Sequence, residues 1–431
     1  MFVYYHTFGC KVNQYETENI RQALETRGFE TVHDINNADI YVINSCTVTS
    51  QADLKLRQFV HKIRRDNLNG IIVVCGCYTQ VMKDHDKVLP EADIIVGASN
   101  KTKIAELIEK YIEDKQKVSY ICEHKKGELF EPMFNIGSDN KTRAIIKVQD
   151  GCDRFCSYCI IPFARGRIRS KTLEDIEIEA KELAKTHSEL VLVGINLSCY
   201  GQDIGNINLA DAVERVCLTS GAKRVRLGSI EPELLTDDII ERLSKLKTLC
   251  PHFHLSLQSG CNKTLKEMKR MYDKEEYFTL VSGLRKHFND CAITTDIMVG
   301  FPGETEDDFN ESLEFVKSVG FAQAHVFPYS KRDGTLAAKR IDQIQNRVKE
   351  SRAKAMTLAV KDSENRFLEN MVGKEYDVLF ERERNKDYHH GHTPNYVLVK
   401  VRSFTDSLWR KTKKIRIASV GDGFVYGEIA E

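Results

Sequence analysis

The feature of this sequence that most restricts the fold is a cysteine-rich loop behind a short apolar run near the middle of the chain. Residues 144–148 are apolar and predict a buried strand, which Gly151 ends. Three cysteines follow with the spacing C-x3-C-x2-C: Cys152, Cys156 and Cys159. Three thiolates on one loop can hold three irons of a four-iron cluster, and the fourth iron is then open to a ligand that is not protein.

Three cysteines on a loop are also compatible with a zinc site short of one ligand or with ordinary core thiols. Zinc ligands usually come as C-x2-C pairs joined to a second such pair or to two histidines. The chain has no such symmetric combination. The spacing therefore favours an iron–sulfur cluster.

Composition places this loop in a large protein with proper cores. The 431 residues, 42% of them hydrophobic, have room for about three domains. Lys and Arg number 63, as do Asp and Glu, so only local basic patches can attract nucleic acid. We find neither a signal peptide nor an apolar run that could span a membrane. With thirteen cysteines, an odd number, the sequence predicts a cytoplasmic protein without disulfides.

The first 120 residues alternate between expected strands and helices. Strands are predicted at residues 2–8, 40–44, 71–74 and 93–96, with helices between them. This alternation predicts a parallel sheet covered on both faces, in a flavodoxin-like or Rossmann-like α/β layer.

Three of these strands are followed by a cysteine at their carboxyl ends: Cys10, Cys46 and Cys77. Each alone is best interpreted as a buried thiol, because free cysteine is among the most buried residue types. Together they would meet at one edge of the sheet, where function gathers, and they predict a second three-cysteine cluster. Cys75 points away from Cys77 by the two-residue alternation and is assigned to the core.

The segments TFGCKVNQYETE, VINSCTVT and VCGCYTQ, with the central loop, resemble the methylthiotransferase family of radical S-adenosylmethionine enzymes. The resemblance extends through the whole chain. It implies that Cys10, Cys46 and Cys77 hold an auxiliary 4Fe–4S cluster that carries sulfur. It also implies that the cluster of the central loop binds S-adenosylmethionine and cleaves it to a 5′-deoxyadenosyl radical.

The region from residue 143 to about 370 repeats strand and helix six times, which predicts a partial (β/α)6 barrel with its site at the carboxyl ends of the strands. Polar residues at those ends can bind the ribose, amino and carboxylate groups of the cofactor. Turn residues that merely end a strand are the alternative. The candidates for cofactor binding are Gly194, Asn196, Glu231, Ser256, Gln258 and Arg270.

Two further cysteines near strand ends, Cys199 and Cys261, could supply a fourth ligand. A fourth thiolate would close the cluster, so both are assigned to the core. The remaining cysteines are interpreted as structural: Cys122, Cys217, Cys250 and Cys291.

The tail begins with a long helix over residues 342–370 and then changes to a period of two, which predicts a small antiparallel barrel. Its position and the closing GDGFVYGEI are similar to the RNA-binding TRAM module. Basic residues interleaved with rings suit single-stranded RNA, although a solvated basic strand face is the alternative. The candidate RNA contacts are Lys400, Arg402, Phe404, Trp409, Arg410, Lys411, Lys413, Lys414 and Arg416.

We therefore divide the chain into residues 1–120, a linker at 121–142, a radical enzyme domain at 143–370 and a TRAM domain at 371–431. The GCKVNQYETE segment resembles the branch that methylthiolates N6-threonylcarbamoyladenosine at position 37 of tRNA. Sister branches act on N6-isopentenyladenosine or on a ribosomal protein aspartate, and the last typically has proline where this chain has Lys11.

The resemblance implies the tRNA anticodon loop and a reductant protein as partners, and it requires both open irons to face one chamber. Two rival classes are a non-catalytic RNA-binding protein with structural metal and a radical methylase with a single cluster.

Overall fold

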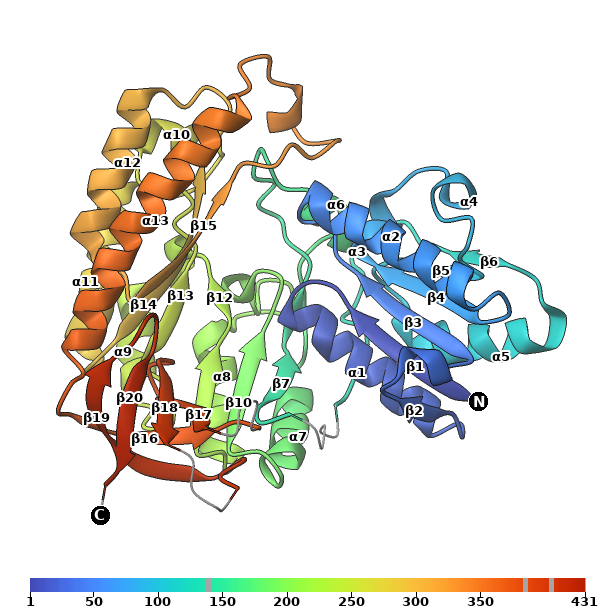
Figure 1. Cartoon of the computed structure of the whole chain (residues 1–431), viewed down its shortest axis with the longest axis horizontal. Helices are drawn as coiled ribbons and strands as arrows, with labels where there is room; N and C mark the ends of the chain where they lie inside the picture. The colour runs from blue at the N-terminus through green and yellow to red at the C-terminus, as the bar shows by residue number, and fades with distance from the viewer. Residues whose placement is uncertain (136–140, 383–386, 403–406, 431) are drawn as a thin grey trace.

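A computed structural model of the chain describes residues 1–135, 141–382, 387–402 and 407–430. Figure 1 shows an α/β layer at the N-terminus, an open barrel of parallel strands beside it and a small β-barrel at the C-terminus. The mixed α/β fold predicted from the sequence is confirmed. Within the described residues, no helix is long and apolar enough to cross a membrane.

The N-terminal layer is built on a fully parallel sheet with the strand order β2-β1-β3-β4-β5-β6 within the described chain. This is the flavodoxin-like order with one strand added at the edge. The four predicted strands are present, and the structure adds two edge strands of three residues each, β2 and β6. The bounds are β1 Phe2–Thr7, β2 Glu30–Val32, β3 Ile40–Ser45, β4 Ile71–Gly76, β5 Ile94–Val96 and β6 Val118–Tyr120.

Helices cover both faces of this sheet because each presents one apolar stripe to it. Leu24 and Ile108 pack on one face, from α1 (Lys11–Glu25) and α5 (Ile104–Asp114), whereas Leu56 and Val60 of α2 (Ser50–Asp66) pack on the other. The short helices α3 (Cys77–Val81) and α4 (His85–Val88) follow β4.

The middle of the chain forms an open barrel from two parallel sheets, β7-β10-β11 and β12-β13-β14-β15. Only Gly228 separates β11 from β12, so one stretch of chain passes from the first sheet to the second. This agrees with the predicted partial barrel. The strands are β7 Ala144–Lys147, β10 Glu189–Val193, β11 Arg224–Leu227, β12 Ser229–Ile230, β13 His252–Leu255, β14 Ala292–Val299 and β15 Gln323–Pro328.

Two helices on the outside of the barrel begin with a threonine whose side chain caps the helix. The Thr172 side chain accepts a hydrogen bond from the Asp175 N–H, and Thr305 forms a capping box with Asp308. The helices are α7 Leu173–Ala184, α8 Leu209–Thr219, α9 Asp237–Ser244, α10 Asn262–Glu267, α11 Lys274–His287, α12 Glu306–Val319 and the long α13 Asn346–Glu369.

The C-terminal strands close into the barrel β16-β17-β18-β20-β19. The prediction that it is antiparallel is wrong at one pairing, because β20 inserts between β18 and β19 and runs parallel to β18. The sequence also missed β17, whose residues YHHGH lack an apolar alternation. The strands are β16 Glu375–Phe380, β17 Tyr388–His392, β18 Leu398–Arg402, β19 Thr412–Val420 and β20 Val425–Ile429.

Candidate active site

The loop with the C-x3-C-x2-C cysteines lies between two short antiparallel strands, β8 (Gln149–Asp150) and β9 (Arg169–Ser170). Gly151 has φ +75°, and a Cβ there would lie 1.8 Å from the Arg167 carbonyl oxygen, so only glycine fits. Cys152 N–H donates to the Gly166 carbonyl over 3.0 Å, and Ser157 N–H donates to the Met268 carbonyl over 3.0 Å. Both halves of the loop are therefore held in place by backbone hydrogen bonds.

The three thiols of the loop lie near one another and near two of the predicted cofactor contacts. Asn196 Nδ2 is 3.7 Å from Cys152 Sγ, and Arg270 Nη1 is 3.5 Å from Cys156 Sγ. Burial raises the pKa of Cys159 to about 12, and the neighbouring thiols add to the shift. A thiol with a raised pKa keeps its proton at neutral pH, and it becomes a strong ligand only when a metal ion replaces that proton.

The other predicted cofactor residues gather around the same loop. Arg270 is ion-paired with Glu231, and its Nη2 lies 3.3 Å from the Ser256 carbonyl oxygen, so Ser256 takes part through its backbone. Gly194 leaves room for Gln149, whose Oε1 accepts a hydrogen bond from Asn196 N–H over 2.8 Å. Within the described residues, Asn196 Oδ1 is buried without a hydrogen-bond partner.

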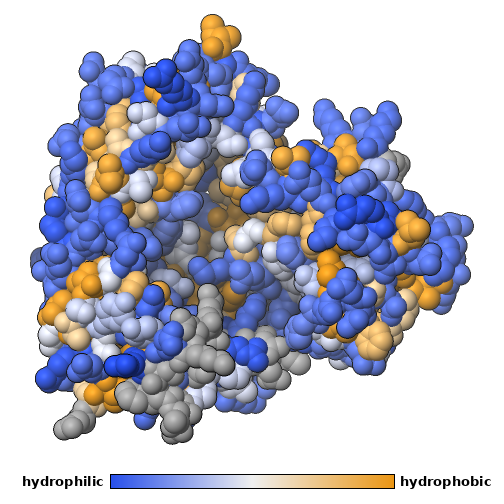
Figure 2. Space-filling model, viewed as in Figure 1, coloured by the Kyte–Doolittle hydropathy of each residue, from blue (hydrophilic) through white to orange (hydrophobic). Residues whose placement is uncertain are grey.

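A cavity of about 870 Å³, here called the cluster-side cavity, opens beside Cys159. Gln258, the last of the predicted cofactor residues, lines it together with apolar and aromatic side chains that suit an adenine ring: Tyr158, Met298, Phe327 and Tyr329. Figure 2 shows the surface hollowed between the N-terminal layer and the barrel.

The strand-end cysteines of the N-terminal layer also lie at one edge. Asn13 Nδ2 donates to the Phe8 and Ser45 carbonyls, at 2.9 Å each, and so ties the ends of β1 and β3 to α1. A Cβ on Gly9 would lie 2.7 Å from Cys46 Cβ, and Cys10 Sγ lies 3.8 Å from Asn13 Oδ1.

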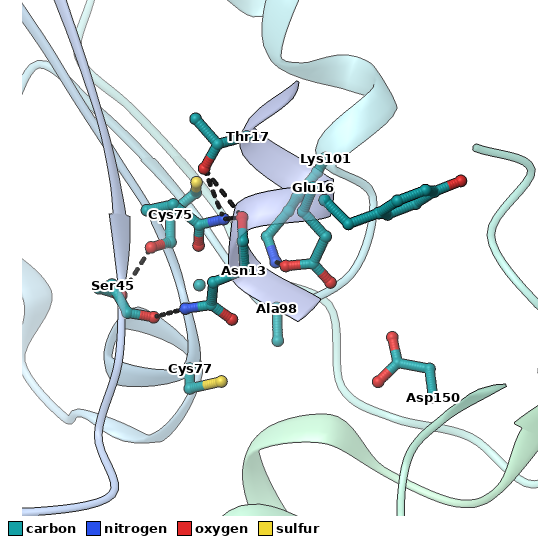
Figure 3. A network of polar contacts seen from close by, with 12 residues as sticks. Asn13, Glu16, Thr17, Ser45, Cys75, Cys77, Ala98, Lys101 and Asp150 are labelled. Atoms are coloured by element: carbon teal, nitrogen blue, oxygen red, sulfur yellow. Dashed lines mark hydrogen bonds and ion pairs between the residues drawn. The ribbon is translucent and has the colours of Figure 1, made fainter. Parts of the chain in front are cut away.

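Cys77 begins α3, at the same edge of the sheet as Cys10 and Cys46. Cys75 is fully buried in the core of the sheet, as predicted. Figure 3 shows the two sulfurs pointing in different directions. Burial raises the pKa of the Cys77 thiol, and the nearby Arg165 guanidinium opposes the shift.

A network of buried charges joins this edge to the barrel, and Figure 3 shows three of its members, Glu16, Lys101 and Asp150. Arg165 Nε donates to Cys77 Sγ over 3.1 Å and also pairs with Glu16. Glu16 pairs with Lys101 and Lys147 as well, and Lys147 lies 2.5 Å from Asp150. Arg165, Lys101 and Lys147 carry three positive charges, whereas Glu16 and Asp150 carry two negative ones. The remaining positive charge beside the cysteines favours the thiolate form.

One cavity is lined by a cysteine of the central loop and by residues that follow Cys46. The cluster-side cavity is lined by Cys159 and also by Val48 and Thr49, which follow Cys46 closely in sequence. Helix α6 (Ile161–Arg165) begins two residues after Cys159 and ends with the arginine that reaches Cys77. A helix of this length advances by about 8 Å, so a short stretch of chain connects the central loop to the arginine that contacts Cys77.

The cysteines assigned to the core are buried or half-buried thiols, apart from Cys122, which is exposed. Cys199 lies near Cys152, and Cys261 Sγ lies 3.7 Å from Asp308 Oδ1. Within the described residues, no group of three His, Cys, Asp or Glu side chains is tight enough for a single metal ion. The ligands of a cubane bind different irons and so lie further apart.

The basic residues of the C-terminal barrel fall into two groups. Trp409 Nε1 donates to Thr142 Oγ1 over 3.2 Å, and Arg410 Nη2 donates to the Lys141 carbonyl over 2.7 Å, so both contact the segment before the barrel. Lys400 lies half-buried over the Phe424 ring. The exposed members are Arg402, Lys411, Lys413, Lys414 and Arg416, and Phe404 lies outside the described residues.

Sequence reasoning missed the buried polar residues Asn13, Glu16 and Arg165. Asn13 and Glu16 follow Cys10 at intervals of three on α1, a spacing that places all three on one helix face. That signal was available, but nothing local indicates that Arg165 would meet them.

Comparison with known proteins agrees with this geometry. Residues 146–316 match the Radical SAM superfamily, and residues 2–97 match a family described as Uncharacterized protein family UPF0004. A Bacillus subtilis protein named threonylcarbamoyladenosine tRNA methylthiotransferase MtaB is 37% identical over 99% of this chain and 96% of its own length. A Thermotoga maritima protein of the same name is 39% identical over 87% of this chain and 85% of its own.

A Clostridium tetani protein named tRNA-2-methylthio-N(6)-dimethylallyladenosine synthase is 36% identical over 88% of this chain and 85% of its own. Among solved structures, a radical S-adenosylmethionine methyltransferase from Kitasatospora setae, TsrM, has a similar fold. Its TM-score is 0.60 at 13% identity, over 78% of this chain and 77% of its own.

The residues present also fit the cofactors of such enzymes. Three thiols of the central loop and three at the strand ends can supply the cluster ligands, and Cys159 lines a cavity with apolar walls. Asn196, whose Oδ1 has no partner among the described residues, lies 3.7 Å from Cys152 Sγ through its Nδ2. The chain therefore belongs to the methylthiotransferase family of radical S-adenosylmethionine enzymes, which transfer a sulfur-containing group by means of two 4Fe–4S clusters and S-adenosylmethionine.

Proposed function

We propose that the protein converts N6-threonylcarbamoyladenosine at position 37 of tRNA to its 2-methylthio derivative. Two observations support this proposal. The chain is similar over almost its whole length to relatives named for that activity, and a cavity beside Cys159 is also lined by residues that follow Cys46. A sulfur carrier and a radical source are both needed to functionalise an unactivated aromatic carbon, and no side chain can supply either.

We infer that Cys152, Cys156 and Cys159 hold the cluster that binds S-adenosylmethionine, and that Cys10, Cys46 and Cys77 hold the cluster that carries sulfur. When bound at the first cluster, S-adenosylmethionine supplies the radical that removes hydrogen from the substrate carbon. The chain itself positions the groups: Arg165 reaches Cys77, and apolar and aromatic side chains line the cavity beside Cys159.

The cofactor contacts that we propose are Gly194, Asn196, Glu231, Ser256, Gln258 and Arg270. Asn196 and Arg270 lie nearest to the thiols and would orient the end of the cofactor that meets iron. Arg270 already pairs with Glu231, so a cofactor carboxylate would share this guanidinium rather than find it free.

For the substrate we propose the anticodon loop of tRNA, bound partly by the C-terminal barrel. The exposed cations of β19 and its neighbours would neutralise phosphates, whereas Trp409 and Arg410 would act by holding the barrel in place. A reductant protein would supply electrons, and the cytoplasm is the proposed location. We retain the domain division at residues 1–120, 121–142, 143–370 and 371–431 as part of this proposal.

The deciding experiment is mass spectrometry of tRNA nucleosides from cells that lack the gene. Selective absence of 2-methylthio-threonylcarbamoyladenosine, restored by the wild-type gene, is the expected result. Loss of the methylthio form of isopentenyladenosine instead would assign the chain to the other tRNA branch, for which the Clostridium tetani relative is named. If the methylthio nucleosides of tRNA are unchanged, the ribosomal protein aspartate remains as the candidate substrate. Lys11 in place of proline argues against that substrate.

The two clusters are tested separately by changing Cys10, Cys46 and Cys77 together to Ala. We expect about half of the iron to be lost while S-adenosylmethionine cleavage under reducing, anaerobic conditions is retained. Changing Cys152, Cys156 and Cys159 to Ala should instead abolish cleavage. Unchanged iron in the first variant would favour a single-cluster methylase, and absence of cleavage in the wild type would favour a non-catalytic RNA-binding protein.

A further inference from the structure

A second cavity, here called the inner cavity, lies on the concave side of the barrel and has a volume of about 430 Å³. Asp296 and His325 line both this cavity and the cluster-side cavity, so the two adjoin. Unlike the apolar cluster-side cavity, the inner cavity is walled by polar side chains that project from successive strands: Arg226, His252, His254, Thr294, Asp296 and His325.

The far end of the inner cavity contains a buried arginine with unused hydrogen-bonding capacity. Arg226 is 3% exposed; its Nε donates to Glu189 over 2.7 Å and its Nη1 donates to the Pro394 carbonyl over 2.9 Å. Within the described residues, its Nη2 is buried and has no hydrogen-bond partner. A buried charged donor without an acceptor is costly, so an anionic acceptor at this place would be bound favourably.

Two neighbours complete this end of the cavity. The Tyr396 ring lies 4.5 Å from the Arg226 guanidinium and forms a rigid wall. Lys11, which directly follows the cluster cysteine Cys10, also lines the cavity and makes no ion pair with any described residue. His252 adds a second donor or acceptor, because its Nδ1 is buried without a partner among the described residues.

The charges of the inner cavity are separated along its length. Asp296 lies at the end shared with the cluster-side cavity, and His254 Nε2 lies 3.3 Å from its Oδ2. Lys11 and Arg226 lie away from that shared wall. The Asp296 carboxylate would repel an anionic group, whereas the two cations would attract it. Such a group would therefore bind at the end formed by Arg226 and Lys11.

We propose that the inner cavity binds a carboxylate carried by the N6 substituent of the target adenosine, with Arg226 and Lys11 as the recognising cations. This inference rests on the proposed function, because it requires the base itself to occupy the cluster-side cavity beside the two triads. It deepens that function by accounting for specificity. An apolar isopentenyl group in the same place would leave the Arg226 and His252 donors unpaired, which disfavours it strongly.

The test compares two anticodon stem-loop RNAs that differ only in charge. One carries threonylcarbamoyladenosine and the other its threonine methyl ester. Each is titrated anaerobically into the reconstituted holoenzyme with S-adenosylhomocysteine, so that no turnover occurs. We expect wild type to bind the acid about tenfold to a hundredfold more tightly than the ester.

Lys11→Met and Arg226→Met should each lose most of this preference by weakening the acid alone, whereas Lys11→Arg should keep it. Arg226 also holds Glu189, so its variant can fail to fold; the exposed Lys11→Met decides by itself. If the variants bind both RNAs more weakly by the same factor, the cations contact a backbone phosphate and the inference is overturned. It is also overturned if the wild type binds the acid and the ester equally well.

Failure of the inference is distinguishable from failure of the proposed function. Equal methylthiolation of the acid and the ester would overturn the carboxylate site and leave the proposed function standing. Methylthiolation of an isopentenyladenosine RNA alone would overturn both.

Discussion

At the scale of single residues, Arg165 is the side chain on which the contacts of the site converge. It donates to Cys77 Sγ over 3.1 Å and to Asn13 Oδ1 over 2.6 Å, and it pairs with Glu16. Its position at the end of α6 links the radical loop to the N-terminal triad by rigid structure. We therefore expect it to position the second cluster.

Arg165→Met should lower the free energy of unfolding by about 3–5 kcal/mol, because a buried ion pair loses one partner. It should also reduce iron bound at the N-terminal triad while cleavage of S-adenosylmethionine persists. Denaturant unfolding, iron content and the spectrum of the reduced clusters check this. Arg167→Met, two residues on and exposed, is the matched control. Wild-type iron and spectra in the Arg165 variant would contradict the positioning role.

Gly151 offers a second test at this scale, because its backbone and its surroundings both exclude a side chain. Gly151→Ala should disrupt the β8–β9 connection and remove the cluster of the central loop, since the new Cβ would lie 1.8 Å from the Arg167 carbonyl oxygen. Gly221→Ala has a similar φ of +78° with no atom within 4 Å, so it should cost only about 1 kcal/mol and keep all the iron. Equal iron content in the two variants would contradict the steric argument.

At the scale of elements, Glu189, the first residue of β10, pairs with two arginines of β11 and with the arginine that precedes β7. Glu189 Oε1 lies 2.8 Å from Arg143 Nε and 2.7 Å from Arg226 Nε, and Arg224 lies 3.6 Å from the other oxygen. Burial would raise the pKa of the Glu189 carboxyl, but Arg226 and Arg143 outweigh it and lower the pKa to about 2.

This shift makes a stability prediction with a definite sign. A carboxyl whose pKa falls from 4.5 to about 2 on folding stabilises the fold by about 3 kcal/mol above pH 4.5, and this is lost as the pH falls towards 2. Glu189→Gln should therefore be destabilised at neutral pH, and its difference from wild type should shrink in acid. Urea unfolding of both at neutral pH and near pH 3 measures this. The exposed Glu314→Gln should change stability little, and a pH-independent difference at Glu189 would refute the linkage.

At the scale of the whole molecule, contacts between segments far apart in the chain hold the three parts together. Tyr396, in a turn with φ +68°, places its ring against the guanidinium groups of Arg143 and Arg226. Trp409 and Arg410 contact residues 141 and 142. The C-terminal barrel is thus docked on the enzyme barrel (Figure 1). The side chains of Lys413, Lys414 and Arg416 on β19 are exposed.

The exposed face predicts how tRNA affinity responds to salt. Changing Lys413, Lys414 and Arg416 together to Gln should weaken tRNA binding and reduce the slope of log affinity against log salt by about 2, at unchanged stability. Filter binding over a range of salt concentrations measures this. Gln at the surface lysines Lys181, Lys185 and Lys245 on the outer helices removes as many charges and should leave the slope as in wild type. An unchanged slope in the β19 variant would mean that this face is only solvated.

Much of this molecule could be read from local patterns. The strands β1, β3, β4 and β5, the caps at Thr172 and Thr305 and the long α13 follow from periodicity and capping, which depend on residues close together in sequence. Cysteine spacing predicts a loop that can hold a cluster, because three ligands on one loop meet without help from the rest of the chain.

What only the tertiary structure decided concerns groups brought together from distant segments. The parallel β18–β20 pair, the strand β17, the buried charges around Glu16 and Arg165, and the inner cavity with Arg226 and Lys11 carry no local signal. A lone charged residue in a sequence is normally solvated, and it becomes a buried pair or a binding group only when its partners arrive from elsewhere. Sequence alone thus determined which chemistry the chain can perform, whereas folding decided which charges surround it.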